Sequence, residues 1–307
     1  MRIVFFGNPE FCSDSLIELN NSNHSIVSVV TNTDRKSGRG LKLNQSFVKR
    51  KAMDLNIPII EVDDVKSDYL VDSLTSLKAD LFVVVAFKFL PDSIISIPKY
   101  GSINIHPSLL PRYRGSSPIQ YALINGDSET GVSIIHLNNK IDSGNILGQK
   151  KIYIDSNETF GELSQKLSVL GSKLLIEVID NIGNTEKSLV QNDSERTLAP
   201  KIKKDDLRID WDCSAVKIHN KIRAFDPYPG AYSFINKKRI KLFGSSLLDL
   251  KTSTQAVNGQ IIIENDSLKI KTGSGYISID MLQVEGKNKI HSSDFIKSLN
   301  KQDYILE

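Results

Sequence analysis

The chain has 307 residues, of which 40% are hydrophobic and 24% are charged, and its formal net charge is +3. This composition is typical of a globular protein and argues against a largely disordered chain. The length is sufficient for two domains with separate cores. A small positive charge permits an anionic partner without requiring one, because electrostatic capture of nucleic acid depends on clustered charges.

The sequence predicts no membrane span, disulfide framework or metal site. No apolar run approaches the roughly 20 residues of a transmembrane helix, and Gly7 and Pro9 interrupt the first apolar run too early for a secretory signal. Cys12 and Cys213 lie far apart and outside any array of metal-ligand spacing. We therefore expect a cytoplasmic protein that uses no metal ion and does not associate with a membrane.

The first part of the chain alternates strand and helix signals. Short apolar runs rich in β-branched residues predict buried strands at 2–6, 25–31, 57–62, 80–87 and 101–105. The segments between them predict helices at 10–20, 46–55 and 67–78. A longer helix is predicted at 158–181, with Asn157 or Ser156 as its N-cap. This alternation predicts an α/β domain with a mostly parallel sheet.

The turn after the first predicted strand, GNPEF at residues 7–11, lacks the G-x-G-x-x-G pattern of dinucleotide-binding folds. Binding of NAD is therefore disfavoured, and Gly7 is interpreted as a residue of turn geometry. In open α/β sheets, ligands bind beyond the carboxyl ends of the central strands. We expect the functional site at that edge.

The character of the sequence changes after residue 188. Residues 189–205 are polar and charged, and they predict a linker between a first domain, 1–188, and a second domain, 206–307. The second domain begins with a predicted helix at 214–225. Short alternating strands follow at 230–235, 238–243, 259–264, 267–272 and 275–286. Their spacing predicts a small antiparallel β-barrel such as an OB-fold, although a sandwich has the same pattern.

Two polar residues occupy the end of the predicted strand at 101–105. Asn104 and His106 are two positions apart, so their side chains point to the same side of the sheet. An amide can donate to a carbonyl oxygen, and an imidazole can stabilise an oxyanion or move a proton, so the pair suits acyl-group transfer. From the sequence Asn104-Ile105-His106 alone, a histidine with a purely structural hydrogen bond is the more frequent case.

The loop that follows strengthens the functional interpretation. Pro107 and Pro111 restrict the backbone around Ser108, Leu109 and Leu110, which predicts a stiff loop with apolar side chains and free backbone amides. Such a loop can form the wall of a pocket for a flat heteroaromatic ligand.

A carboxylate further along the chain is a candidate partner of the histidine. Asp142 follows a predicted strand that contains His136, and Gly144 comes two residues later. A carboxylate beside an imidazole fixes its tautomer and favours its protonated form. From the spacing alone, an Asx-turn is an equally good interpretation of Asp142. His136 has apolar neighbours and is interpreted as structural.

Several segments together resemble the methionyl-tRNA formyltransferase family, in order and over nearly the whole chain. They are FFGNPEF (5–11), DRKSGRGLKL (34–43), SINIHPSLLPRYRGSSPIQYALINGD (102–127), IDSGNIL (141–147), RIDW (208–211) and IRAFDPYPGAYS (222–233). The central block is highly specific for folate-dependent formyltransferases, and the C-terminal segments indicate the tRNA-directed member. The resemblance implies a Rossmann-like formyltransferase domain followed by an OB-like domain that holds tRNA.

The resemblance also implies roles for individual residues. Asn104, His106 and Asp142 match the catalytic residues of the family, and the stretch Ser108, Leu109, Leu110 and Pro111 matches its 10-formyltetrahydrofolate site. The basic loop of Arg35, Lys36, Arg39 and Lys42 matches the segment inserted near the acceptor end of the initiator tRNA. The residues of this loop by themselves predict a flexible cationic arm suited to phosphates, and a solvated surface loop is an equally good interpretation.

The chain departs from the family pattern at two positions. Asn145 stands where the family usually has a second acid, and Lys36 stands where it usually has a proline. A neutral Asn145 could alter the polarity of the folate pocket. Asp142 itself is retained, so we expect the chemistry to be retained.

The function expected from the resemblance is formylation of methionyl-initiator tRNA by a monomer with 10-formyltetrahydrofolate as co-substrate. Sugar formyltransferases share the first domain, so an amino sugar nucleotide is an alternative acceptor. A glycinamide ribonucleotide acceptor fits less well, because those enzymes resemble only the first domain. A non-catalytic RNA-binding protein is the alternative of another class, since OB-folds bind nucleic acid.

Overall fold

The structure is a computed structural model that describes residues 1–37, 42–183, 188–248, 256–264, 267–299 and 304–307. The chain forms two compact units. The first comprises Met1–Ser116, Thr130–Ile152 and Ser164–Ala199, and the second comprises Ser117–Glu129, Tyr153–Leu163 and Pro200–Glu307. Residues 189–199 of the predicted linker thus belong to the first unit. The domain limits 1–188 and 206–307 stay a prediction.

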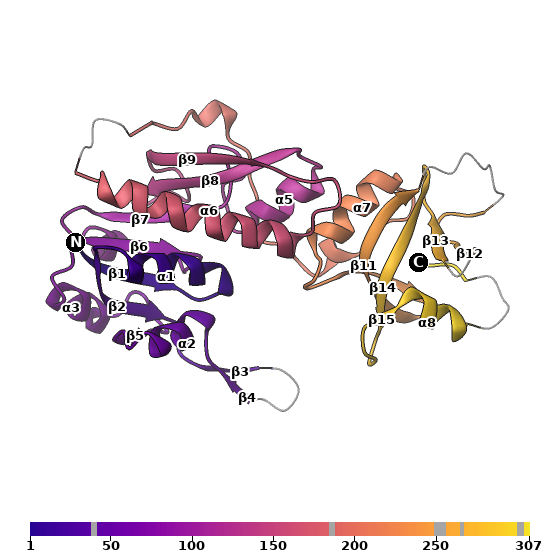
Figure 1. The fold of residues 1–307 in the computed structure, drawn as a ribbon, viewed down its shortest axis with the longest axis horizontal. Coiled ribbons are helices and arrows are strands. Elements are labelled where there is room, and N and C mark those ends of the chain that lie inside the picture. Colours follow the sequence, from indigo (N-terminus) through magenta and orange to yellow (C-terminus); the bar gives the residue numbers. More distant parts are fainter. Residues whose placement is uncertain (38–41, 184–187, 249–255, 265–266, 300–303) are drawn as a thin grey trace. The chain divides into compact units, whose positions relative to one another are not determined.

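The first unit is built on a sheet of seven strands in the order β5-β2-β1-β6-β7-β8-β9 (Figure 1). The strands are β1 (Arg2–Gly7), β2 (Ser25–Thr31), β5 (Ile59–Glu61), β6 (Leu81–Val85), β7 (Ser102–His106), β8 (Glu129–His136) and β9 (Ile146–Tyr153). The neighbouring strands β5, β2, β1, β6 and β7 are parallel, and β8 is antiparallel to β7. The predicted α/β class with a mostly parallel sheet is confirmed.

Helices cover both faces of this sheet. They are α1 (Ser13–Asn21), α2 (Phe47–Asp54), α3 (Asp68–Ser76), α4 (Asp92–Ile95) and α6 (Phe160–Asp180). Val4, Phe6, Phe82 and Val84 pack in one cluster with apolar residues of α3 and α4. On the other face, a Cβ at Gly171 of α6 would lie 3.1 Å from Ile105, so α6 approaches β7 closely. The central strands are therefore buried on both sides, as their apolar composition predicts.

Local side-chain bonds explain where two of the helices begin. Ser46 caps α2 by accepting a hydrogen bond from the Lys49 amide at 2.9 Å. Before α6, the Glu162 carboxylate accepts a bond from the Thr159 amide, and the Glu162 amide donates to the Thr159 hydroxyl. This reciprocal pair is a capping box. The predicted N-cap of this helix, Asn157 or Ser156, is therefore wrong by two or three residues.

Between β2 and α2, the chain forms a short antiparallel hairpin of β3 (Arg35–Ser37) and β4 (Lys42–Asn44). The sequence predicted only a flexible loop here. Short 3₁₀ helices lie at Glu10–Cys12, Asp193–Glu195 and Asp205–Leu207.

The second unit contains an antiparallel sheet in the order β10-β11-β14-β13-β12, with β15 paired to β14. Its elements are α5 (Pro118–Ile124), α7 (Ala215–Ala224), β10 (Ala231–Ile235), β11 (Lys238–Leu248), β12 (Ile261–Glu264), β13 (Ser267–Lys271), β14 (Tyr276–Val284), β15 (Ile290–His291) and α8 (Ser292–Lys297). The predicted C-terminal antiparallel β domain is confirmed.

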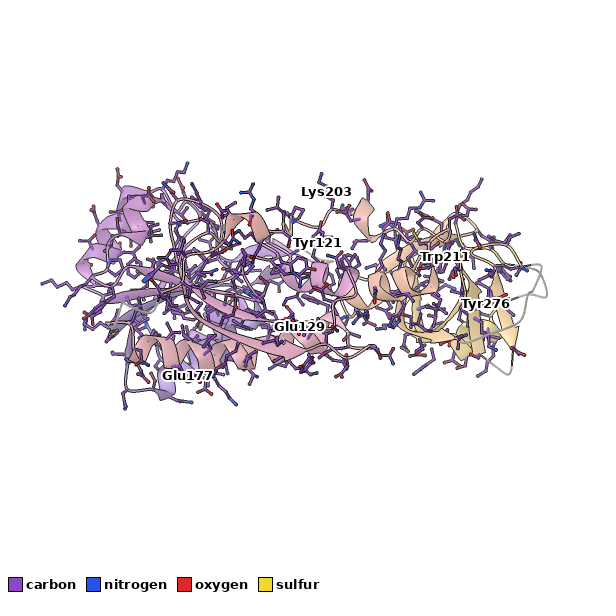
Figure 2. All side chains as sticks on the ribbon, turned by 90° about the horizontal axis from the view of Figure 1, so that it is seen from above. Tyr121, Glu129, Glu177, Lys203, Trp211 and Tyr276 are labelled. Carbon is purple, nitrogen blue, oxygen red and sulfur yellow. The ribbon has the colours of Figure 1, made fainter. Side chains whose placement is uncertain are left out.

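Trp211 anchors the core of the second unit (Figure 2). It is buried in one cluster with Ile218 and Ile222 of α7 and with Ile277 of β14. Its indole N–H donates to the Ser233 hydroxyl at 2.9 Å, so the polar end of the ring is satisfied.

Among the described helices, none is long and apolar enough to cross a membrane.

Candidate active site

Strand β7 presents Asn104 and His106 from the same side, since alternate residues of a strand point to the same face. Asn104 is half-buried, and no hydrogen bond joins its side-chain amide to another described residue. His106 is only 3% exposed. The pair therefore combines an available amide with a ring whose surroundings are fixed.

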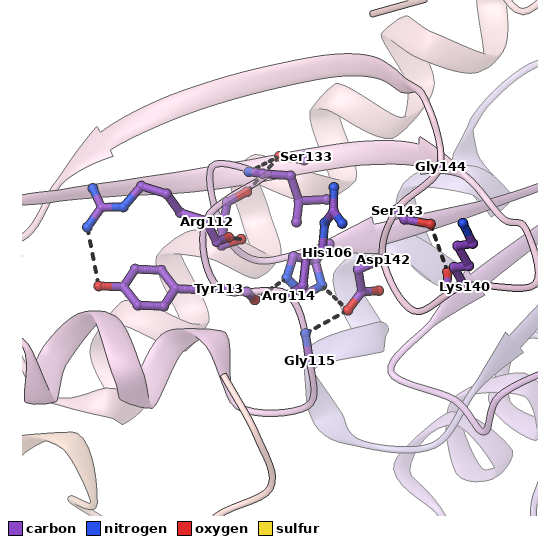
Figure 3. A network of polar contacts seen from close by, with 12 residues as sticks. His106, Arg112, Tyr113, Arg114, Gly115, Ser133, Lys140, Asp142, Ser143 and Gly144 are labelled. Atoms are coloured by element: carbon purple, nitrogen blue, oxygen red, sulfur yellow. Dashed lines mark hydrogen bonds and ion pairs between the residues drawn. The ribbon is translucent and has the colours of Figure 1, made fainter. Parts of the chain in front are cut away.

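The His106 ring lies between two hydrogen-bond acceptors (Figure 3). Its Nε2 atom is 2.9 Å from the Tyr113 carbonyl oxygen, and its Nδ1 atom is 3.6 Å from Asp142 Oδ2. The Tyr113 carbonyl oxygen can only accept, so Nε2 carries the proton of that hydrogen bond, whereas Nδ1 lies at ion-pair distance from the carboxylate and beyond good hydrogen-bond length. The carboxylate is therefore placed to stabilise a positive charge on the ring whenever the ring carries one.

Asp142 reaches His106 from the loop between β8 and β9. Its carboxylate is largely buried, and Oδ2 also accepts a hydrogen bond from the Gly115 amide at 2.8 Å. The backbone of Asp142 is left-handed, with φ +48°. Few residues other than glycine adopt this region without support from the surrounding structure, and aspartate is one of those that tolerate it. The structure thus brings together the carboxylate and imidazole that the sequence proposed as partners.

Glycines allow the close backbone approaches that this arrangement needs. A Cβ at Gly144 would lie 1.7 Å from the His136 carbonyl oxygen, so no side chain fits at this position. A Cβ at Gly115 would lie 2.4 Å from the Ala199 carbonyl oxygen, and Gly115 has φ +128°. Backbone packing therefore requires the glycines of the IDSG and RYRG sequences.

The predicted folate loop is only partly available to a ligand. The amide of Ser108 donates to the His106 carbonyl oxygen, and that of Leu110 donates to the Ser133 hydroxyl. The prediction of free backbone amides is wrong for these two residues. The side chains of Ser108 and Leu110 are buried, whereas Leu109 and Pro111 are half-buried. Leu109 and Pro111 are therefore the members of this loop that can contact a ligand.

The predicted tRNA contacts fall on the β3–β4 hairpin. Arg35 and Lys36 lie on β3, and Lys42 lies on β4. Arg39 lies outside the residues that the structure describes.

Asn145, the neutral substitute for the usual acid, donates from its side chain to the Ser188 hydroxyl at 3.5 Å, a long hydrogen bond.

His136 has a different environment from His106. Burial lowers the pKa of its imidazole below the ordinary value, which favours the neutral ring. It lies at the end of β8 and pairs with Ile103 of β7, which is three residues before His106 on that strand. The structure agrees with its interpretation as a structural residue.

Sequence reasoning missed the groups that hold the site together. The Tyr113 carbonyl and the Gly115 amide contact His106 and Asp142 through their backbones, which no side-chain pattern reveals. Arg114 is 6% exposed, and its guanidinium donates to Gln191 and pairs with Asp193 at 2.8 Å. This pairing holds the pKa of the Asp193 carboxyl below its ordinary value. Within the described ranges, no group of three or more His, Cys, Asp or Glu side chains is placed to hold a metal ion.

Comparisons with known proteins show which family the chain belongs to. Residues 1–179 match the model "Formyl transferase", and residues 201–300 match "Formyl transferase, C-terminal domain". Methionyl-tRNA formyltransferase from Thermodesulfovibrio yellowstonii is 40% identical over 295 residues, covering 96% of this chain and 94% of the relative.

Solved structures share the fold. An N-formyltransferase from Helicobacter canadensis, solved with folinic acid and dTDP-3-aminofucose, has a TM-score of 0.68 at 22% identity and covers 90% of this chain and 97% of its own. A variant of HypX from Aquifex aeolicus also has a TM-score of 0.68, at 18% identity. It covers 96% of this chain, which spans 48% of the HypX chain.

The order of motifs, the two-unit fold and the full-length match agree, and the resemblance predicted from the motifs is confirmed. The chain belongs to the methionyl-tRNA formyltransferase family.

Proposed function

We propose that this protein transfers the formyl group of 10-formyltetrahydrofolate to the amino group of methionyl-initiator tRNA. The observation that carries the proposal is the arrangement around β7, where the available Asn104 amide stands beside an imidazole held between the Tyr113 carbonyl and Asp142. The identity with curated relatives over nearly the whole chain supports the same reaction. The product serves translation initiation.

The reaction is an acyl transfer through a tetrahedral intermediate. The free amine of methionyl-tRNA attacks the formyl carbon, a new C–N bond forms, and the carbonyl oxygen becomes an oxyanion. The bond from the formyl carbon to N10 of the folate then breaks. The amine loses a proton and N10 gains one, so the net reaction releases tetrahydrofolate and formyl-methionyl-tRNA.

Asn104 and His106 stabilise the oxyanion in this proposal. A donor that already points at the position of developing charge stabilises the transition state without reorganisation. The Asn104 amide has no competing bond to a described residue. The His106 Nδ1 atom is 3.6 Å from Asp142, beyond good hydrogen-bond length, so its N–H can donate to the substrate oxygen.

Asp142 supports the positive charge of His106 and directs the water that removes the amine proton. Its largely buried position strengthens the interaction with the imidazolium, since less water screens the two charges. The Gly115 amide fixes one carboxylate oxygen at 2.8 Å. The carboxylate therefore has a defined orientation before substrate binds.

We propose that the loop 108–111 lines the folate site mainly through Leu109 and Pro111, and that Ser108 and Leu110 shape it from beneath. Apolar, half-buried side chains suit the flat ring system of a folate. The buried Ser133 hydroxyl donates to the Ser108 carbonyl oxygen at 2.7 Å and accepts from the Leu110 amide. These bonds keep the loop stiff.

We propose that Arg35, Lys36, Arg39 and Lys42 contact the tRNA, together with the C-terminal domain of residues 206–307. Basic side chains on a hairpin supply the phosphate contacts that dominate affinity for nucleic acid. We also propose that the protein works as a monomer in the cytoplasm, where translation begins.

Transfer of a radiolabelled formyl group tests this function. With labelled 10-formyltetrahydrofolate, we expect formylation of methionyl initiator tRNA and much less of methionyl elongator tRNA. UDP-amino-arabinose serves as the rival acceptor. Label transferred to the sugar nucleotide and not to the tRNA would overturn the proposal, and binding of RNA without any folate binding would indicate a non-catalytic protein.

A further inference from the structure

Gln191 connects the segment after α6 to the loop that carries Asp142. The residue is 8% exposed. The amide nitrogen donates to the carbonyl oxygens of Asp142 at 2.9 Å and Gly144 at 2.7 Å. The amide oxygen accepts from Nε and Nη2 of Arg114 at 3.0 and 2.8 Å. Both N–H groups and both lone pairs of the side chain are therefore used.

The segment around Gln191, residues 189–199, is held along its length, and we call it the strap. Leu189 pairs through its backbone with Ile146 at the start of β9. At the other end, the Arg114 amide donates to the Thr197 carbonyl at 2.9 Å, and the Ala199 amide donates to the Arg114 carbonyl at 2.7 Å. The strap thus contacts both loops that flank His106.

We propose that Gln191 is a positioning residue for formyl transfer, because it fixes the turn at residues 142–144 so that the Asp142 carboxylate faces the His106 ring. The strap lies between the two matched family models, which end at residue 179 and begin at residue 201. The segment interpreted from the sequence as a linker is thereby part of the catalytic apparatus. The inference rests on the proposed function.

Backbone geometry explains why the turn at residues 142–144 needs hydrogen bonds from Gln191 to keep its conformation. Asp142 has φ +48°, and an aspartate held in this conformation is at higher energy than in an extended or helical one. Gln191 binds the carbonyl groups on both sides of Ser143, so the turn cannot open without leaving these groups unpaired. If Gln191 is lost, Asp142 can return to negative φ, and its carboxylate then leaves the Gly115 amide and His106.

Two substitutions separate this role from general stability. Gln191→Ala removes all four bonds. Gln191→Glu keeps the volume and strengthens the bonds to Arg114, but it places carboxylate oxygens against two carbonyl groups and removes both donors. We expect both variants to lower kcat about 10- to 100-fold, since a shift of about 1 Å in a catalytic group can cost this much. Asn192→Ala is the matched control, because Asn192 is the exposed neighbour and bonds only within its own turn among the described residues.

A double-mutant cycle with Asp142→Ala tests whether Gln191 acts through Asp142. We expect Gln191→Glu to lower kcat in the wild-type background and to have no further effect in the Asp142→Ala background. A residue that only stabilises the fold would lower kcat by the same factor in both backgrounds. That additive result would overturn the proposal.

Hydrogen exchange of the Gly115 amide gives a readout that does not depend on activity. This amide donates to Asp142 Oδ2, so we expect faster exchange in Gln191→Glu and unchanged exchange in Asn192→Ala. Unchanged exchange in Gln191→Glu would overturn the positioning role even if the wild-type protein proved to formylate another acceptor. Absence of formyl transfer by the wild-type protein, with the exchange difference present, would instead refute the proposed function. It would leave intact the inference that Gln191 fixes the turn at residues 142–144.

Discussion

Two buried histidines in this protein have opposite surroundings. His106, in the first unit, lies between the Tyr113 carbonyl and the Asp142 carboxylate, which can only accept. His219, in α7 of the second unit, lies between the Ser156 carbonyl and the Ser245 hydroxyl, each at 2.9 Å. A hydroxyl can donate, so a neutral ring with its proton on Nε2 satisfies both partners of His219.

In the proposed mechanism, this difference separates a functional histidine, His106, from a structural one, His219. Burial, with a contribution from the nearby Arg223 charge, lowers the pKa of His219 below its ordinary value, and the neutral form is favoured. His106 instead has a carboxylate at one nitrogen, the arrangement that supports a charged ring during catalysis. Burial is nearly the same for the two rings, so the groups around each ring, and not its burial, carry the proposed assignment.

The largest effect is expected from Asp142→Asn. This change replaces the acceptor of the Gly115 amide and His106 Nδ1 by a side chain that can present N–H groups to them. By analogy with the loss of the orienting carboxylate in a catalytic triad, kcat should fall roughly 10³- to 10⁴-fold. Single-turnover formyl transfer measures it, and a loss below tenfold would contradict the assigned role.

Asn104→Ala should have the next largest effect. Removal of one oxyanion donor lowers turnover roughly 10²- to 10³-fold in precedent enzymes. Because Asn104 makes no side-chain hydrogen bond to another described residue, we expect the melting temperature to change little. Wild-type kcat at saturating substrates would remove Asn104 from the mechanism.

His219→Ala should affect stability and leave the chemistry unchanged. The Ser156 carbonyl and the Ser245 hydroxyl lose their buried partner, which should lower the free energy of unfolding by about 1–3 kcal/mol. Denaturant unfolding measures the change. The exposed His291→Ala is the control and should match the wild-type protein. Equal stability of both variants would show that the His219 bonds contribute nothing.

The smallest expected effect is the pH dependence of stability. Because the folded-state pKa values of His219 and His136 lie below 6.5, the unfolded state binds more protons as the pH falls through that value. Their stabilising contribution is therefore complete above about pH 6.5 and is lost below it. Urea unfolding at a series of pH values should show a shallower acid-side decline in His219→Ala. An identical decline would mean that His219 does not titrate as described.

The fold was largely predictable because each strand carries its own signal. The apolar runs at 25–31 and 267–272 coincide with β2 and β13 to within one residue, since burial on a sheet imposes a composition that can be read locally. The N-cap of α6 was misplaced, because Asn157 and Ser156 have the same capping chemistry as the true cap, Thr159. Only the reciprocal bond with Glu162 distinguishes them.

The site was predictable only in part. Asn104 and His106 follow from strand periodicity, but spacing alone did not separate Asp142 from an ordinary turn residue, and the family resemblance was needed. The occupied amide of Leu110 and the bound carbonyl of Ser108 depend on Ser133, which is distant in sequence. Gln191 lies in a polar segment with no periodicity, and its role depends on long-range contacts that no local pattern encodes.

Parallel measurement of formyl transfer and unfolding in His106→Gln and His219→Gln tests the central claim most directly. The account predicts that His106→Gln lowers kcat by roughly 10²- to 10⁴-fold, the usual contribution of a catalytic acid–base group. It predicts that His219→Gln lowers the free energy of unfolding and keeps wild-type kcat. Full activity of His106→Gln with methionyl initiator tRNA would contradict the account.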